Sequence, residues 1–403
     1  MPEKIQPTTG PDIRAFGDRQ FEQASKYSPL VLPLHRLLIP NHPDLEQESA
    51  VRMGTEIMLD TDSLVLITGR GNPELADDIS KLLRMKIDHQ PINVFKDGES
   101  HHQLGDNMRE KDVIIIQTTA RSADGKMSVN DAIMDTYLMT RAAKRAYAAK
   151  IRLIIPYFGY SRQDKRNMSR EPVSASDVVQ MLIGAGADSI LTMDLHSGAT
   201  EGSTPAGEPM DILYGSAVLL PEIKRMGLDF NNVVVVSPDA GGTKRAQRYS
   251  ELLGLGSKIE FLQKDRPADN VAEILGTTGG IGCYKDKDIL IVDDMADTCR
   301  TFVEGTDYLK KVGRARSVTV VVTHGLFSTD EKGVKASDKI TASGVDRVIV
   351  TDTVAQSEEI KNNPKIKIVT VAPLLAEAAR RLHTGKSLSK LIPMPNGNWV
   401  QTC

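Results

Sequence analysis

The stretch Asp288-Ile-Leu-Ile-Val-Asp-Asp-Met-Ala-Asp-Thr-Cys-Arg-Thr301 decides the fold. Ile289 to Val292 is an unbroken apolar run, which is typical of a strand buried on both faces of a parallel sheet. The run ends in two adjacent carboxylates, Asp293 and Asp294, and apolar residues at helical spacing follow Thr301. The pattern predicts a strand, a turn and a helix. It places the turn at the carboxyl edge of an α/β sheet, where ligands bind.

The same turn carries groups suited to a sugar phosphate. Adjacent carboxylates can accept hydrogen bonds from sugar hydroxyls, while hydroxyl side chains, backbone N–H groups and a helix N-terminus can bind a phosphate. The alternative is an acidic helix cap, since Asp and Thr cap many helices. The complete ten-residue string from Val292 to Thr301 favours a ribose phosphate site over a cap. The candidate residues are Asp293, Asp294, Asp297, Thr298, Cys299, Arg300 and Thr301.

Strand and helix patterns alternate along most of the chain, which predicts parallel sheets with right-handed crossovers. Two such series predict two similar α/β domains, residues 62–209 and 210–391, whose facing loops would form the site. Residues 1–61 are predicted to be an N-terminal extension with one helix near 45–58, and residues 392–403 a tail. Strands are predicted at 64–68, 113–117, 153–156, 189–193, 233–236, 259–262, 289–292 and 318–322 and near 348 and 368; helices are predicted at 74–83, 132–149, 174–183, 244–253 and 374–382.

The composition is that of an ordinary globular protein. The chain has 403 residues, of which 40% are hydrophobic, and its net charge of −3 gives no reason to expect nucleic acid or a membrane as a partner. No apolar run reaches the length of a membrane span. Three cysteines, Cys283, Cys299 and Cys403, lack paired or metal-site spacing. A reducing, cytoplasmic location is therefore predicted.

Two further strand ends carry groups that suit a phosphate or a metal. Ser237-Pro-Asp-Ala-Gly-Gly242 follows a predicted strand. Gly241 and Gly242 would let the backbone approach a phosphate, and Asp239 could bind a divalent cation or a hydroxyl. Asp194-Leu-His196 ends another strand at the same predicted edge. A glycine turn and a histidine satisfied within the fold are the structural alternatives.

Three polar segments are more informative as complete strings than as single residues. Phe158-Gly-Tyr-Ser-Arg-Gln-Asp164 combines an arginine suited to phosphate with Gln163 and Asp164, which can contact an adenine or a ribose. Phe95-Lys-Asp-Gly-Glu99 and Lys264-Asp-Arg-Pro267 are the other two. Taken separately, the three are also consistent with exposed charged loops or a plain turn.

In order along residues 64 to 391, these motifs resemble those of phosphoribosyl pyrophosphate synthetases, the ribose-phosphate diphosphokinases. The opening stretch looks like their ribose 5-phosphate loop, a variant of the type I phosphoribosyltransferase loop. The resemblance implies two similar type I phosphoribosyltransferase-like domains, each a mostly parallel sheet flanked by helices. It also implies transfer of the diphosphate of magnesium-ATP to the 1-hydroxyl of ribose 5-phosphate, which gives 5-phosphoribosyl 1-diphosphate and AMP for nucleotide biosynthesis.

The resemblance also implies roles for individual residues and a homo-oligomer, either a hexamer or a smaller assembly. His196 and Asp239 would bind Mg²⁺, and Lys264 and Arg266 would hold the transferring group from a mobile loop. Asp293 and Asp294 would hold the ribose hydroxyls, while residues 297–301, with Asp239, Gly241 and Gly242, would complete the ribose 5-phosphate site. ATP would contact Phe95, Asp97 and Glu99, typically from a neighbouring subunit, and Arg162, Gln163 and Asp164.

Three departures from the family pattern leave alternatives open. Arg300 stands where the family has a glycine, and it would either crowd the phosphate loop or point outward and add charge. Asp265 replaces an arginine, and Gly202 to Ile212 differs from a region that binds allosteric nucleotides in relatives. A non-catalytic homologue that associates with active synthetase subunits is therefore the main alternative. A phosphoribosyltransferase is a third hypothesis, which the nucleotide segments do not favour.

Overall fold

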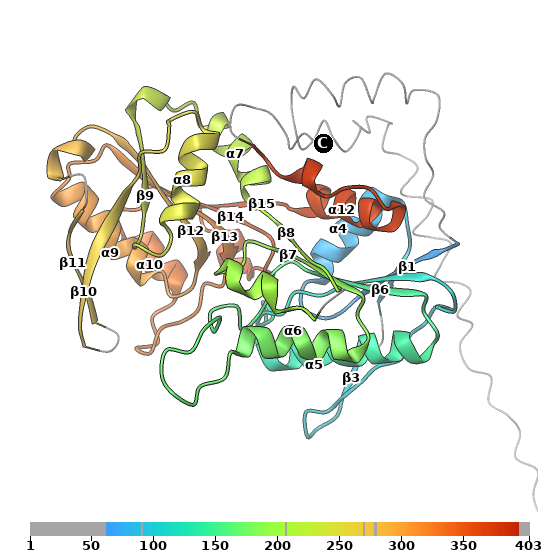
Figure 1. Ribbon diagram of the computed structural model, residues 1–403. Helices are drawn as coiled ribbons and strands as arrows, with labels where there is room; N and C mark the ends of the chain where they lie inside the picture. The colour runs from blue at the N-terminus through green and yellow to red at the C-terminus, as the bar shows by residue number, and fades with distance from the viewer. Residues whose placement is uncertain (1–61, 90–91, 206–207, 269–270, 278–279, 395–403) are drawn as a thin grey trace, which may run out of the picture.

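A computed structural model describes residues 62–89, 92–205, 208–268, 271–277 and 280–394, and it describes residues 263–268, 271–275, 277 and 281 by their backbone alone. The extension 1–61, with its predicted helix, and most of the predicted tail lie outside these residues. The described chain forms two large sheets with helices on their faces (Figure 1). The predicted α/β architecture of two mostly parallel sheets is confirmed.

The first sheet has six strands in the order β2-β1-β5-β6-β7-β8, and all neighbours are parallel. Strand β8 extends this sheet past residue 209, where the sequence pattern placed the domain boundary. Helices α5 and α6 cover one face (Figure 1). The elements are β1 (Leu64–Thr68), α4 (Pro73–Leu83), β2 (Ile87–His89), β5 (Asp112–Ile116), α5 (Val129–Arg145), β6 (Lys150–Ile155), α6 (Ser174–Ala185), β7 (Ser189–Met193), η2 (Gly198–Ser203) and β8 (Met210–Leu213).

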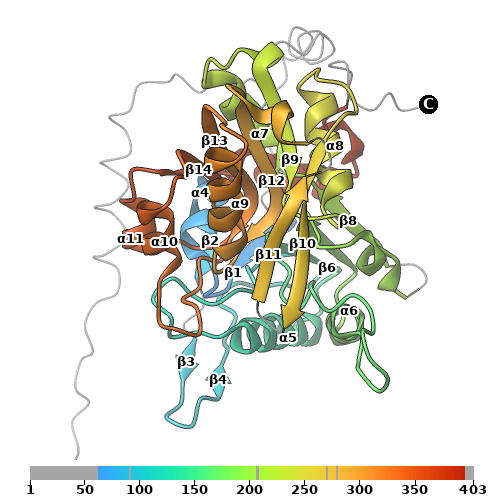
Figure 2. The ribbon, with the colours of Figure 1, turned by 90° about the vertical axis from the view of Figure 1, so that its left-hand side faces the viewer.

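The second sheet has seven strands in the order β11-β10-β9-β12-β13-β14-β15, and β12, the strand of the opening motif, lies at its centre. Its neighbours are parallel except β10 and β11, which form an antiparallel ribbon (Figure 2). The elements are α7 (Ser216–Arg225), η3 (Phe230–Asn232), β9 (Val233–Ser237), α8 (Thr243–Leu252), β10 (Glu260–Ala268), β11 (Val271–Thr277), η4 (Ile281–Tyr284), β12 (Asp288–Ala296), α9 (Arg300–Lys311), β13 (Ser317–Gly325), α10 (Ala336–Ala342), β14 (Arg347–Thr351), α11 (Glu358–Lys361), β15 (Ile366–Val369), α12 (Ala372–Thr384) and η5 (Ser389–Leu391).

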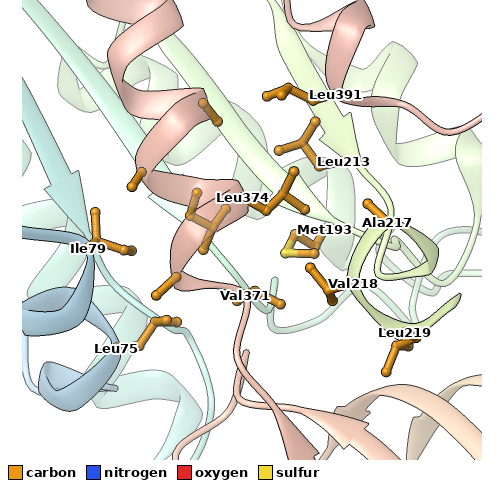
Figure 3. Close-up of a cluster of buried hydrophobic side chains, with 14 of the residues drawn as sticks. Leu75, Ile79, Met193, Leu213, Ala217, Val218, Leu219, Val371, Leu374 and Leu391 are labelled. Atoms are coloured by element: carbon orange, nitrogen blue, oxygen red, sulfur yellow. The ribbon is translucent and has the colours of Figure 1, made fainter. Parts of the chain in front are cut away.

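The two sheets share one hydrophobic core. Along β12 the side chains alternate, because successive residues of a strand point to opposite faces. Leu290 and Val292 join the shared core, whereas Ile289 and Ile291 pack toward α9 and α10. Helices α4, α7 and α12 contribute Leu75, Val218 and Leu374 to the shared core, which also includes Met193 and Leu213 of the first sheet (Figure 3). The two halves are therefore joined by buried apolar contacts that fix the carboxyl edges of their sheets.

Local signals explain some element boundaries. Helix α5 begins after a capping box in which the Ser128 hydroxyl bonds the Asp131 amide and the Asp131 carboxylate bonds the Ser128 amide. Two predicted boundaries are corrected. Helix α5 ends at Arg145 rather than Ala149, and β10 continues through residues 264–267, which were expected to turn. Antiparallel pairing with β11 extends this strand beyond its short contact with β9.

Asp352 is expected to destabilise the fold at neutral pH. Its Oδ1 accepts the Val371 amide at 2.7 Å, and burial raises the pKa of this carboxyl group to about 6. The unfolded value is about 3.9, so the protonated form stabilises the fold at low pH, and this contribution is lost as pH rises through about 6. Asp352→Asn should therefore raise the free energy of unfolding by about 2–3 kcal/mol at pH 8 and by almost nothing at pH 4.

Denaturant titrations at the two pH values test this expectation, with the exposed residue Asp338 changed to Asn as the matched control. A gain that is equal at both pH values would contradict it.

Among the described residues, no helix is both long enough and apolar enough to cross a membrane.

Candidate functional site

The carboxylates of Asp293 and Asp294 lie within β12 near its carboxyl end, because this strand continues to Ala296. Asp294 is 2% exposed. Its Oδ2 lies 2.8 Å from Nδ1 of His196, and its Oδ1 lies 3.5 Å from Nη1 of Arg245. The same guanidinium nitrogen lies 3.2 Å from Oδ1 of Asp293. A histidine of the first half and an arginine of α8 thus meet at the acidic pair.

These contacts give the two carboxyl groups different pKa values. Burial and the neighbouring charge of Asp294 raise the pKa of Asp293 well above its usual value. Burial also opposes the ionisation of Asp294, but the hydrogen bond from His196 and the charge of Arg245 hold its pKa well below the usual value. The same hydrogen bond outweighs burial and raises the pKa of His196. An anionic Asp294 is the state that best accepts ribose hydroxyls.

Asp239 and Asp293 both approach Gly242. Its Oδ1 accepts the Gly242 amide at 3.0 Å. A Cβ atom added to Gly242 would lie 2.7 Å from the Ser237 hydroxyl and 3.8 Å from Oδ1 of both Asp239 and Asp293. Glycine is therefore required for this close approach. Of the two metal candidates, His196 contacts Asp294, and Asp239 lies at the glycine turn that Asp293 also approaches.

In the part of the chain that the structure describes, these two side chains do not belong to a larger ligand cluster. Among the described residues, no group of three or more His, Cys, Asp or Glu side chains is placed to hold a metal ion. Mg²⁺ retains several waters and is often bound through one or two protein ligands together with substrate phosphates. The donor set formed by His196 and Asp239 fits such a loosely held ion better than it fits a fully protein-bound one.

The turn at 297–299 leads from β12 into α9. Cys299 has a left-handed backbone, with φ of 58°, and its side chain does not cap the helix. The first-turn N–H groups of α9 are therefore not capped by this residue, and such groups suit a phosphate. Nζ of Lys339 lies 3.1 Å from the Thr298 carbonyl oxygen. Burial raises the pKa of the Cys299 thiol to about 12, which keeps it protonated.

The candidate nucleotide loop meets this turn directly. Nη1 of Arg162 lies 2.7 Å from Oδ2 of Asp297, which is 135 residues away in the sequence. Oε1 of Gln163 accepts the Ser174 hydroxyl at 2.5 Å, and the charge of Asp164 contributes to the raised pKa of His196. The arginine predicted to bind nucleotide phosphate is thus adjacent to the loop predicted to bind ribose phosphate.

Other predicted site residues lie apart from the acidic pair Asp293 and Asp294 or are described only by their backbone. Phe95, Asp97 and Glu99 belong to a separate two-stranded hairpin, β3 (Asn93–Val94) and β4 (Ser100–His101), which extends beyond α5 (Figures 1 and 2). Lys264 and Arg266 lie on β10, and their side chains are outside the described part of the structure. The family resemblance implies a mobile loop for Lys264 and Arg266. In the structure this segment is extended backbone in the β10–β11 ribbon.

Sequence reasoning missed Arg245 and the role of Asp194. Arg245 lies in the first turn of α8, where basic residues are common on exposed faces, so the sequence held no distinguishing signal. Asp194 has φ of 34°, and its Oδ2 accepts the Gly215 amide at 2.7 Å and the Thr323 hydroxyl at 2.5 Å. This carboxylate therefore ties the strand end that carries His196 to the second sheet.

The side chain of Arg300 pairs along its own helix. It is the first residue of α9, its side chain is 46% exposed, and its Nε lies 2.7 Å from Oε1 of Glu304, one turn further along the helix. The left-handed position in this loop belongs to Cys299 rather than to residue 300. The structure thus favours the outward alternative, with the added charge already paired.

Two family models match most of the described chain. Residues 64–186 match the N-terminal domain of ribose phosphate pyrophosphokinase, and residues 274–393 match the phosphoribosyl synthetase-associated domain. The ribose-phosphate pyrophosphokinase of Neisseria meningitidis serogroup A is 39% identical over 82% of this chain and 95% of its own length. The corresponding protein of Haemophilus influenzae is 37% identical over 81% of this chain and 98% of its own.

A solved structure extends this similarity to the fold. The phosphoribosylpyrophosphate synthetase from Mycobacterium smegmatis superposes with a TM-score of 0.70 at 31% identity, over 80% of this chain and 99% of that chain.

Proposed function

Because the chain belongs to the ribose-phosphate pyrophosphokinase family, we propose that it transfers the diphosphate of magnesium-ATP to the 1-hydroxyl of ribose 5-phosphate, releasing AMP. The observation that carries the proposal is the contact of Arg162 with Asp297, beside the contact of His196 with Asp294. These two contacts join the candidate nucleotide and ribose phosphate segments at one centre. The relatives are named as enzymes, so a non-catalytic regulatory role is not favoured.

The proposed reaction is an in-line displacement. The 1-hydroxyl oxygen attacks the β-phosphorus, its proton is released, and the bond from that phosphorus to the oxygen of AMP breaks. Asp293 and Asp294 hold ribose hydroxyls, and residues 297–301, with Gly241 and Gly242, surround the 5-phosphate. Lys264 and Arg266 stabilise the charge of the transferring group, because such transfers depend mainly on positioned positive charge. We assign no side chain as a general base.

His196 and Asp239 are the residues proposed to hold Mg²⁺. Since Nδ1 of His196 faces Asp294, its Nε2 is the ring nitrogen left for a ligand. Bound magnesium would neutralise charge on the ATP phosphates. Arg162, Gln163 and Asp164 are proposed to bind ATP from the same chain.

We propose that Phe95, Asp97 and Glu99 also contact ATP, and that the protein is a homo-oligomer in which this hairpin reaches a neighbouring subunit. Phe95 is 55% exposed and the hairpin extends away from the body, which supports the proposal. The division into domains 62–209 and 210–391 and the cytoplasmic location also stay predictions.

A phosphorus NMR assay tests the proposed function. With magnesium-ATP and ribose 5-phosphate, we expect equimolar AMP and a ribose that carries a new diphosphate signal. A parallel sample without ribose 5-phosphate separates transfer from ATP hydrolysis. AMP formation that does not depend on the sugar, or the lack of AMP in both samples, would exclude the proposed reaction.

The outward position of Arg300 gives a further prediction. Arg300→Gly should change KM for ribose 5-phosphate by less than about threefold, because an exposed, paired charge contributes little. Glycine in the first turn should lower the free energy of unfolding by at most about 1 kcal/mol. Steady-state kinetics and denaturant titration check both values, with Glu304→Gln as the control that removes only the pairing. A tenfold or larger change in KM would show that the guanidinium of Arg300 contacts the ligand.

A further inference from the structure

The β3–β4 hairpin has little to hold it in place by itself. It forms a two-stranded sheet separate from both large sheets and stands clear of the body (Figure 2). Two backbone hydrogen bonds at its tip are internal, from the Phe95 amide to the Glu99 carbonyl at 2.8 Å and from the Gly98 amide to the Phe95 carbonyl at 2.9 Å. An isolated two-stranded hairpin is marginally stable in water. Contacts at its base must therefore fix its direction.

One buried carboxylate gathers these basal contacts. Asp135 of α5 is fully buried, and its Oδ1 accepts the Ser100 hydroxyl at 2.9 Å and lies 3.1 Å from Nε2 of His102. The side chain of His102 is 3% exposed. Arg70, in the turn after β1, places Nε at 2.8 Å and Nη2 at 2.7 Å from Oδ2 of the same aspartate. Three segments distant in the sequence therefore converge on one side chain.

The chemistry of this cluster favours positioning over net stability. A buried ion pair adds little net stability to the fold, because its attraction is largely offset by the cost of desolvating both charges. Its hydrogen bonds nevertheless fix the geometry. Arg70 balances the charge of Asp135, which leaves Oδ1 to bind the hairpin through Ser100 and His102. A rigid base of this kind limits the directions in which Phe95, Asp97 and Glu99 can point.

We infer that Asp135 is a positioning residue for ATP, which acts by holding the β3–β4 hairpin through Ser100 and His102. The inference rests on the proposed function, since it takes Phe95, Asp97 and Glu99 as nucleotide contacts. It adds Asp135, Ser100 and His102, none of which need touch a substrate.

The chain contains a control cluster of similar composition on the six-stranded sheet. Asp112, the first residue of β5, lies 2.9 Å from Nε of Arg152 and 3.0 Å from Nδ1 of His383. The hydroxyl of Ser63 lies 3.5 Å from Nε2 of His383. This cluster has the same four residue types, although its serine contacts the histidine rather than the aspartate, and it lies at the amino edge of the sheet. S63A/H383A is therefore the structural counterpart of S100A/H102A.

The test measures ligand binding and hydrogen exchange on the full-length protein, so it does not depend on turnover. S100A/H102A keeps the pairing of Arg70 with Asp135 and leaves no buried charge unpaired. We expect it to weaken calorimetric binding of a non-hydrolysable magnesium-ATP analogue by roughly tenfold or more, because small displacements of positioning groups have large effects. Binding of ribose 5-phosphate should change by less than about twofold, as expected for an uncoupled site.

Hydrogen exchange supplies the second readout. The amides of Phe95 and Gly98 should lose protection in S100A/H102A and keep it in S63A/H383A, which should also bind the analogue normally. Unchanged protection, unchanged analogue binding, or equal weakening of both ligands would each overturn the inference. The proposed reaction is judged separately by the NMR assay of the unmodified protein, so failure of one does not imply failure of the other.

Discussion

Replacing Lys264 with alanine is expected to lower kcat by about 10³-fold while leaving ribose 5-phosphate binding nearly unchanged. The size of this decrease in kcat follows from the loss of one positioned cationic donor at the transferring group, where charge develops only in the transition state. Binding of ribose 5-phosphate depends instead on the carboxyl end of β12 and the first turn of α9. The effect should therefore appear in kcat rather than in the dissociation constant of the sugar phosphate.

Stopped-time AMP assays and calorimetry with ribose 5-phosphate measure the two quantities. Lys258, an exposed lysine just before β10, supplies the matched variant Lys258→Ala, which should retain full turnover. If Lys264→Ala turns over at a normal rate, Lys264 does not belong to the catalytic residues. If the affinity for ribose 5-phosphate falls by the same factor as kcat, Lys264 stabilises the bound substrate rather than only the transition state.

Replacing Asp294 with asparagine is expected to weaken ribose 5-phosphate binding by about a hundredfold or more. Hydrogen bonds to a charged acceptor contribute roughly 1.5–3 kcal/mol each, and the neutral amide forfeits that charge. The substitution also removes the anion that His196 and Arg245 face, while it keeps nearly the same shape. The largest effect should fall on the sugar phosphate, with a secondary loss of turnover.

The pKa of His196 provides an independent readout. It is raised in the folded protein by the hydrogen bond to Asp294, so it should fall back toward about 6.5 in Asp294→Asn. Proton NMR of the ring resonances follows this change without substrate. Asp307→Asn, on the exposed side of α9, is the control and should alter neither the pKa nor binding. A pKa of His196 that does not move would show that the contact with Asp294 is not its cause.

Much of the fold could be read from local patterns in the sequence. Mostly apolar runs predicted β1 and β7 at their observed bounds, and the unbroken run from Ile289 to Val292 predicted β12 within its observed length, because strands buried on both faces are rich in apolar residues. The polar motifs at the ends of these strands could be predicted to lie at one site, since parallel strands place their carboxyl ends at one edge of a sheet. Short elements such as β8 and the β3–β4 hairpin were not predicted, because two to four residues carry no periodic signal.

The sequence by itself therefore determined the α/β class, the family and the residue types gathered at the strand ends. Only the tertiary structure decided which of them meet: His196 with Asp294, Arg162 with Asp297, and the unpredicted Arg245 with both carboxylates of β12. It also decided that Arg300 pairs with Glu304 and points outward. The physical reason is that a strand or helix follows from neighbours within a few residues. Charge pairing across two sheets instead depends on the shared core that fixes their edges.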